Sequence, residues 1–268
     1  MHNPYFDLTE ELNAEGSIAA LASGQAVVFY RIAMMSKDGD WILQETPDAC
    51  ARVLAVMEKH GARYRPGAPL DIRWLGGGWS SHFEFFDPQE RRIRCDFLSR
   101  PPRVRREEVA ALFMPPQAEP PLVVGVEPLI RMKQTQRAKD YPIIGELARL
   151  LSPERELELT TDPDRIIALA PLHGKESRRL PVKVAFDGHP REDVVVELAR
   201  ETDRMQNADR TRLDHYRNAS EAFLREFQAA GIGKLDLPEA HQRICDLAER
   251  LLPRNPLATG DSDHGIAE

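Results

Sequence analysis

A proline-rich stretch from Pro101 to Pro121 constrains the fold of this chain more than any other feature. Neither a long helix nor a central strand can run through it, because proline lacks the backbone N–H group and clashes inside a helix. Apolar residues from Val109 to Met114 interrupt the prolines, which favours an ordered connector over a flexible linker. We therefore expect an α/β part over residues 1–115, a mainly helical part over residues 122–252 and a polar tail over residues 253–268.

Hydrophobic patterning predicts both helices and strands in the first part. The clearest helix opens at Thr46 and Pro47, which suit the N-cap and the first helical position, and it ends at Gly61. Its apolar residues recur at helical spacing and form one buried stripe, made of Cys50, Val53, Leu54 and Met57. The other expected elements are a helix at 8–23, strands at 26–30, 38–43 and 69–75, and a hairpin at 81–98 with its turn at Asp87.

The second part is predicted to be mainly helical. Two helices over residues 127–151 should break near Tyr141 and Pro142, because proline ends or kinks a helix. Residues 192–230 and 238–252 also have helical patterns. The pattern of residues 153–190 is ambiguous, and short strands are expected there at 165–170 and 180–186.

The composition excludes several classes of protein. The 268 residues carry a formal net charge of −7, which argues against a dedicated nucleic-acid coat but allows a local basic groove. No apolar run approaches the ~20 residues that span a bilayer, and the first residues lack the pattern of a signal peptide, so no membrane role is expected. Cys50, Cys95 and Cys245 form no CxxC pair and the histidines show no zinc spacing, which favours a reduced, cytoplasmic protein.

Two acidic residues alternate at the start of one expected strand. Asp38 and Asp40 stand at i and i+2, so a β-strand directs both carboxylates to one face. Two such charges repel, and Mg²⁺ suits the space between them because it takes hard oxygen ligands and keeps positions for phosphate and water. Asp96, between two apolar residues of the hairpin, is the candidate third acid. The plainer alternatives are a turn at the Asp-Gly pair and an ordinary acid at a strand end.

The order of these features resembles the minimal nucleotidyltransferase fold of the polymerase-β superfamily, and within it the bacterial nucleotidyltransferase-like proteins that include type IV toxins of the AbiEii group. A strand precedes the Asp-Gly-Asp run, a proline-started helix follows it, and a hairpin strand then carries Cys-Asp-Phe-Leu. The resemblance covers roughly residues 15–150. It implies an α+β fold, in which a nucleotidyltransferase-like mixed β-sheet is flanked by helices and followed by a mainly helical C-terminal domain.

The same resemblance implies an activity and a site. The reaction would be a metal-dependent transfer of NMP from an NTP to a hydroxyl or phosphate acceptor, for which RNA and protein are both candidates. Asp38, Asp40 and Asp96 would hold Mg²⁺ and carry catalysis, with Asp96 assisting deprotonation of the acceptor. A K-x-x-x-R-x-K-D segment, similar to one that begins the family's helical part, would bring cations to the triphosphate, namely Lys133, Arg137 and Lys139. A solvated helix face is the plainer explanation of these cations.

One family feature is missing from the place where we expect it. The family usually carries Gly-Gly or Gly-Ser just before the first helix of the fold, where backbone N–H groups contact phosphate. The comparable residues, from Val28 to Ala33, contain no glycine, although Arg31 offers a charge. This departure favours an alternative function, in which a non-catalytic relative uses the same fold for binding or as an antitoxin-type partner.

Other candidate residues have plainer explanations. The arginines of the hairpin and of the loop after it could steer a nucleotide or RNA, but a solvated surface balanced by acids explains them as well. Trp41 and Trp79 could stack on a base, whereas core packing is the commoner fate of tryptophan. His82 and Glu84 share a strand face and could be mistaken for metal ligands. A DxD glycosyltransferase would need a large nucleotide-binding sheet before Asp38, for which ~37 residues are too few.

Overall fold

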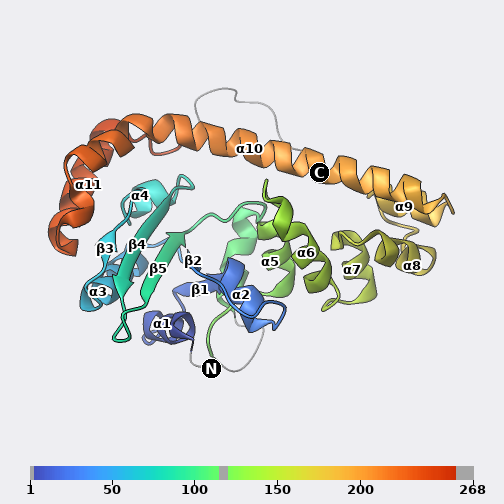
Figure 1. Ribbon diagram of the computed structural model, residues 1–268, viewed down its shortest axis with the longest axis horizontal. Coiled ribbons are helices and arrows are strands. Elements are labelled where there is room, and N and C mark those ends of the chain that lie inside the picture. Colours follow the sequence, from blue (N-terminus) through green and yellow to red (C-terminus); the bar gives the residue numbers. More distant parts are fainter. Residues whose placement is uncertain (1–2, 115–119, 258–268) are drawn as a thin grey trace.

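The computed structural model describes residues 3–114 and 120–257. A mixed five-stranded sheet with helices around it is followed by a mainly helical region, which confirms the expected architecture (Figure 1). The strands are β1 Ala19–Ala22, β2 Gly39–Leu43, β3 Arg63–Tyr64, β4 Ser80–Phe86 and β5 Arg92–Leu98. The helices of this part are α1 Pro4–Leu12, α2 Ser23–Phe29, α3 Pro47–Lys59 and α4 Ile72–Leu75. In the order β1-β2-β5-β4-β3, β2 and β5 run parallel, whereas the other neighbouring pairs are antiparallel.

Alternation along β4 and β5 gives the sheet one apolar and one more polar face. The apolar face is buried and carries Phe83, Phe85, Ile93, Cys95 and Phe97. Trp41 of β2 stacks on Phe97 with ring centroids 5.3 Å apart, and its indole N–H donates to the Thr9 hydroxyl of α1. His60, at the end of α3, stacks on Phe85 at 4.8 Å. Because α1 and α3 lie against the apolar face, the opposite face is left for the candidate site.

The N-terminal segment differs from the prediction. The predicted helix at 8–23 ends at Leu12, and residues 19–22 form β1 instead. Their sequence, Ala-Ala-Leu-Ala, favours a helix by propensity, but pairing with β2 and complete burial decide its conformation. The predicted strand at 26–30 is also wrong, because residues 23–29 form α2.

Helix α3 and the hairpin agree with the prediction. The Thr46 side chain caps α3, and Gly61 after its end has a φ of +64°, the left-handed conformation that terminates helices. β4 and β5 pair across the turn that begins at Asp87. The predicted strand at 69–75 is wrong, since its second half forms α4, which is capped by the Asp71 side chain.

The helical region begins with short helices. They are η1 Arg106–Phe113, α5 Val126–Lys133, η2 Ala138–Asp140, α6 Tyr141–Ala148, α7 Pro153–Leu159, α8 Pro163–His173 and α9 Leu180–Phe186. The predicted break near Tyr141 is confirmed, but the predicted strands at 165–170 and 180–186 are wrong, because both segments are helical. Helices α7 to α9 bury their own small core with the start of α10, and its central members include Leu157, Ile166, Val182 and Val194.

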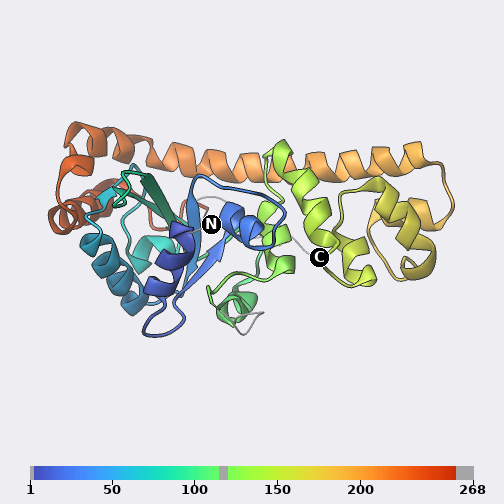
Figure 2. The same cartoon turned by 60° about the horizontal axis from the view of Figure 1, so that its bottom comes forward.

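A long helix, α10 Arg191–Ala229, runs along the whole molecule (Figures 1 and 2). Its first turns pack on α8 and α9, and its last turns reach the sheet, where Phe223 and Phe227 join the main core. After η3, Ile232–Lys234, the chain turns into α11, Leu237–Leu251, which packs against β3 and α3. The C-terminal helices therefore share a core with the sheet.

Two remaining expectations concern the tail and membranes. The predicted tail starts in contact with the sheet domain, because the Trp79 indole N–H donates to the Pro253 carbonyl at 2.8 Å. Residues 258–268 of that tail lie outside the described residues. Within the described part of the chain, no helix combines the length and the apolar character needed to cross a bilayer.

Candidate functional site

The three predicted acids lie together on the polar face of the sheet. Asp40 of β2 and Asp96 of β5 are register partners in the parallel pair, so their side chains are neighbours. The predicted strand at 38–43 begins one residue later, so Asp38 lies in the bend just before β2, and its side chain is 41% exposed at the edge of a cavity. This cavity, of about 500 Å³, brings together all six residues predicted for the site, namely Asp38, Asp40, Asp96, Lys133, Arg137 and Lys139. Their juxtaposition is a structural fact, whereas their chemical roles remain predictions.

Asp40 is the acid most affected by its surroundings. Burial, together with the negative charges of Asp96 and Asp38, raises the pKa of this carboxyl group to about 6. A hydrogen bond from Ser23 and the nearby His82 act in the opposite direction. Collecting these acids therefore costs the protein free energy, which a cation bound among them would offset.

Asp38 and Asp96 differ in their partners. Oδ1 of Asp38 is buried and accepts no hydrogen bond, and the guanidinium of Arg94 lies 3.5 Å from it. Oδ1 of Asp96 accepts from Arg65 at 3.1 Å and contacts Nδ1 of His82 at 2.7 Å. No three His, Cys, Asp or Glu side chains of residues 3–114 and 120–257 are already grouped to hold a metal ion. A cation here would have to complete its shell with water and ligand oxygens, as Mg²⁺ commonly does.

The cations of the cavity come from the segment between α5 and α6. Lys133 is only 6% exposed, and its Nζ lies 3.4 Å from Asp140. Burial lowers the pKa of Lys133, and the charge of Asp140 counteracts this. Arg137 also pairs with Asp140, at 3.4 Å, so this buried carboxylate holds two of the predicted phosphate ligands. Asp140 is a site residue that the sequence analysis did not assign.

Two small residues, Ser23 and Gly24, begin α2 directly after β1. Both residues line the cavity. A Cβ atom on Gly24 would lie 2.2 Å from Oγ of Ser36, so the approach of α2 to the loop before Asp38 requires glycine. The sequence alone did not single out this pair, because it predicted a helix at 8–23 and a strand at 26–30.

Helix α10 fixes the cationic segment from the opposite side. Asp209 is buried and accepts a hydrogen bond from the backbone N–H of Gln136 at 3.0 Å. Arg103 donates to the carbonyl oxygens of both Gln134 and Met205. These contacts join residues 31 to 102 positions apart in the chain, and no local pattern could have predicted them.

The other residues considered from the sequence have structural roles. Trp41 is fully buried and Trp79 nearly so, which agrees with core packing. His82 contacts Asp96, and Glu84 pairs with Arg92 and with Arg65. The arginines of the hairpin likewise form ion pairs with nearby acids.

Comparisons with known proteins give little beyond a general likeness. No protein-family description matches the chain, and no curated protein matches it either. Among solved structures, a "putative nucleotidyltransferase" from Helicobacter pylori is 13% identical with a TM-score of 0.38, and the match covers 77% of this chain and 94% of that one. The protein JHP933 from Helicobacter pylori is 14% identical with a TM-score of 0.38, covering 81% of this chain and 95% of that one.

Proposed function

We propose that this chain is a metal-dependent nucleotidyltransferase that moves NMP from an NTP to a hydroxyl or phosphate acceptor. The observation that carries the proposal is the meeting of three acids, two of them on adjacent parallel strands, with three cations in one cavity. Acids on one wall suit a metal, and cations on another suit a triphosphate, which is the division of charge that phosphoryl transfer needs.

Asp38 and Asp40 are the residues that would hold the metal. The buried Oδ1 of Asp38 has no hydrogen-bond donor, and the high pKa of Asp40 reflects repulsion that a cation would relieve. When bound, Mg²⁺ would neutralise charge on the phosphates and on the leaving group. Asp40 would hold it from β2, and Asp38 from the bend that precedes this strand.

Lys133 and Arg137 would contact the triphosphate, with Lys139 at the same wall. Asp140 keeps the first two in place while engaging only part of their hydrogen-bonding capacity. A buried ammonium group interacts strongly with phosphate because little water screens it. Gly24 lets the loop that carries Ser36 pack close to the α2 backbone at the edge of the same cavity.

Asp96 would accept the proton of the attacking acceptor hydroxyl. Arg65 and His82 both contact its Oδ1, which fixes the carboxylate and leaves Oδ2 to receive that proton. The attacking oxygen then forms a bond to the α-phosphorus, and the bond from that phosphorus to the bridging oxygen of pyrophosphate breaks.

Labelled transfer tests this function directly. The full chain is incubated with Mg²⁺, total RNA and one α-³²P-labelled NTP at a time. Label is then measured on the RNA and on the protein, whose own side chains serve as a second acceptor. We expect one NTP to label an acceptor, and Asp38→Asn to reduce the rate about 10²-fold or more. Asp48→Asn is the matched control, because Asp48 is an exposed acid on α3 away from the cavity. Unchanged transfer by Asp38→Asn, or no transfer from any NTP, would contradict the proposal.

A non-catalytic binding protein of the same fold is the second candidate function. It is favoured by the pairing of Asp96 with Arg65 and His82, and by the lack of a preformed three-ligand metal group among the described residues. Melting temperature with Mg²⁺ and each NTP separates the two candidates. An enzyme should be stabilised by its NTP, whereas no shift with any NTP favours the binding protein.

A further inference from the structure

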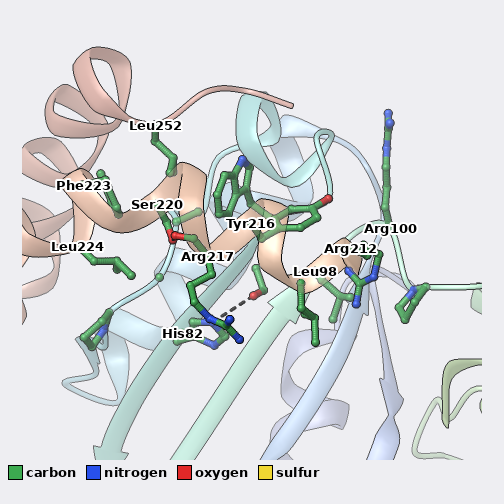
Figure 3. A pocket seen from close by; sticks show the side chains of 18 residues that line it. His82, Leu98, Arg100, Arg212, Tyr216, Arg217, Ser220, Phe223, Leu224 and Leu252 are labelled. Atoms are coloured by element: carbon green, nitrogen blue, oxygen red, sulfur yellow. Dashed lines mark hydrogen bonds between the residues drawn. The ribbon is translucent and has the colours of Figure 1, made fainter. Parts of the chain in front are cut away.

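A second cavity, of about 430 Å³, lies between the sheet and α10 (Figure 3). His82 and Leu98 of the sheet form one wall, and Arg212, Tyr216 and Arg217 of α10 face them. None of the described residues that line it is an aspartate or glutamate. The wall therefore combines basic with apolar and aromatic groups, whereas the first cavity contains acids as well as cations.

Two features of the sequence shape this cavity. One is the helical spacing of residues on α10, and the other is a glycine at each of two places where a side chain packs against the backbone. The residues that α10 contributes recur at three- and four-residue intervals and so share one face; they are Arg212, Leu213, Tyr216, Arg217, Ser220, Phe223 and Leu224. A Cβ atom on Gly67 would lie 2.3 Å from Cδ2 of His82, and one on Gly78 would lie 2.3 Å from the Tyr216 hydroxyl. Only glycine at these two positions lets the imidazole and the phenol occupy their observed places.

The two arginines retain donors for a ligand. Arg212 pairs with Asp209, and Arg217 pairs with Asp214, each through one or two of five guanidinium N–H groups. Figure 3 shows Arg217 reaching from α10 toward His82, whereas Arg100 points away from the cavity, toward its partner Glu45. An anion between α10 and the sheet would thus meet two guanidinium groups.

His82 connects this cavity to the acids. Its Nδ1 lies 2.7 Å from Oδ1 of Asp96, and its Nε2 lies 3.1 Å from Oγ of Ser80. A ligand in the cavity would therefore be one side chain away from the acid assigned to proton removal. The ring of Tyr216, with Trp79 edge-on to it at 4.9 Å, supplies an aromatic surface beside the arginines.

We propose that this cavity binds a nucleoside phosphate carried by the acceptor. Arg212 and Arg217 would hold the phosphate and Tyr216 would pack against the base, because guanidinium groups match phosphate and aromatic rings stack on any base. The volume suits a ligand of this size. The identification of the ligand as the acceptor rests on the proposed nucleotidyltransferase function, whereas its binding does not. The nucleoside phosphate is either a free nucleotide or the terminal nucleotide of a nucleic-acid strand.

Binding without metal or NTP tests the site separately from catalysis. The full chain in EDTA is titrated by calorimetry with the four nucleoside 5′-monophosphates, with trinucleotides ending in the same bases, and with inorganic phosphate. We expect saturable nucleotide binding that Arg217→Glu weakens about tenfold or more. Arg225→Glu is the matched control, because Arg225 is equally exposed on α10, has a similar ion pair and does not line the cavity.

The outcomes distinguish this proposal from the proposed function. Binding that persists in Asp38→Asn while transfer is lost supports both, and binding without any transfer supports the cavity alone. A trinucleotide that binds more tightly than the monophosphate would identify the ligand as the end of a nucleic-acid strand. Equal affinity for the two would identify it as a free nucleotide. Equal weakening by Arg217→Glu and Arg225→Glu, equal affinity for inorganic phosphate, or no saturable binding would overturn the proposal.

Discussion

The two cavities beside the sheet handle charge in opposite ways. In the acid-bearing cavity three carboxylates lie together, one oxygen of Asp38 is buried without a hydrogen bond, and the pKa of Asp40 is raised to about 6. In the basic cavity, Arg212 and Arg217 each have a carboxylate partner on their own helix. Asp38 and Asp96 have arginine partners, but the charge of Asp40 is unfavourable for the isolated protein, whereas both arginines of the basic cavity are paired. A group of charges that lowers the free energy of unfolding is better evidence of function than a group whose charges are balanced.

Loss of activity at Asp96 should be the largest effect. Asp96→Asn keeps the size of the side chain but removes the proton acceptor, so we expect transfer to fall by about 10²- to 10⁴-fold. Steady-state rates with saturating NTP measure it. His82→Gln should cost less, because His82 contacts Asp96 but is not the proposed proton acceptor. Equal losses in both variants would contradict the assignment of proton removal to Asp96 alone.

Replacing Asp40 should stabilise the protein, and we expect this change in stability to be larger than that of any substitution in the basic cavity. Because burial and like charges raise its pKa from 3.8 to about 6, Asp40→Asn should raise the free energy of unfolding by roughly 1 to 3 kcal/mol at pH 7.5 in EDTA. The folded wild-type protein takes up a proton as the pH falls through about 6, so the gain should shrink and vanish near pH 4. Urea unfolding at several pH values measures the gain. A gain that is independent of pH would point to better packing instead of relieved repulsion.

Removing a charge from the basic cavity should have the smallest effect on stability. Arg217→Gln breaks an exposed pair with Asp214, and such pairs contribute about 0 to 1 kcal/mol. Urea unfolding should therefore place this variant within about 0.5 kcal/mol of the wild type. A larger loss would mean that the arginine supports the fold, and the contrast between the two cavities would fail.

Local patterns were sufficient for the elements that place the acids. Short segments predict the cap of α3 at Thr46, the hairpin turn at Asp87 and a strand at 38–43, of which all but Asp38 belongs to β2. The contact between His82 and Asp96 was also accessible, because the hairpin register makes them cross-strand partners. The catalytic and binding roles of these residues do not follow from the patterns, and the experiments above test them.

Other features depend on contacts that no short segment encodes. The alanines of β1 become a strand only because β2 and the segment at Val123 flank them. Helices α8 and α9 form where strands were predicted, because their apolar residues bury against α7 and α10. The bond from Gln136 to Asp209 requires α10 to return across the molecule. Burial and long-range pairing decided the conformation in each case, against or beyond local propensity.

The long helix α10 also determines where this chain can accept insertions or deletions. It is continuous for 39 residues between the small core of α7 to α9 and the sheet. Adding or removing one residue in its middle would turn everything beyond that point by about 100° and shift it by about 1.5 Å. Arg217 and Tyr216 would then face solvent or the wrong neighbour, unless the distal helices rotated with them. Natural variants of this protein should therefore tolerate insertions in the loops between α6 and α9 far more readily than within α10.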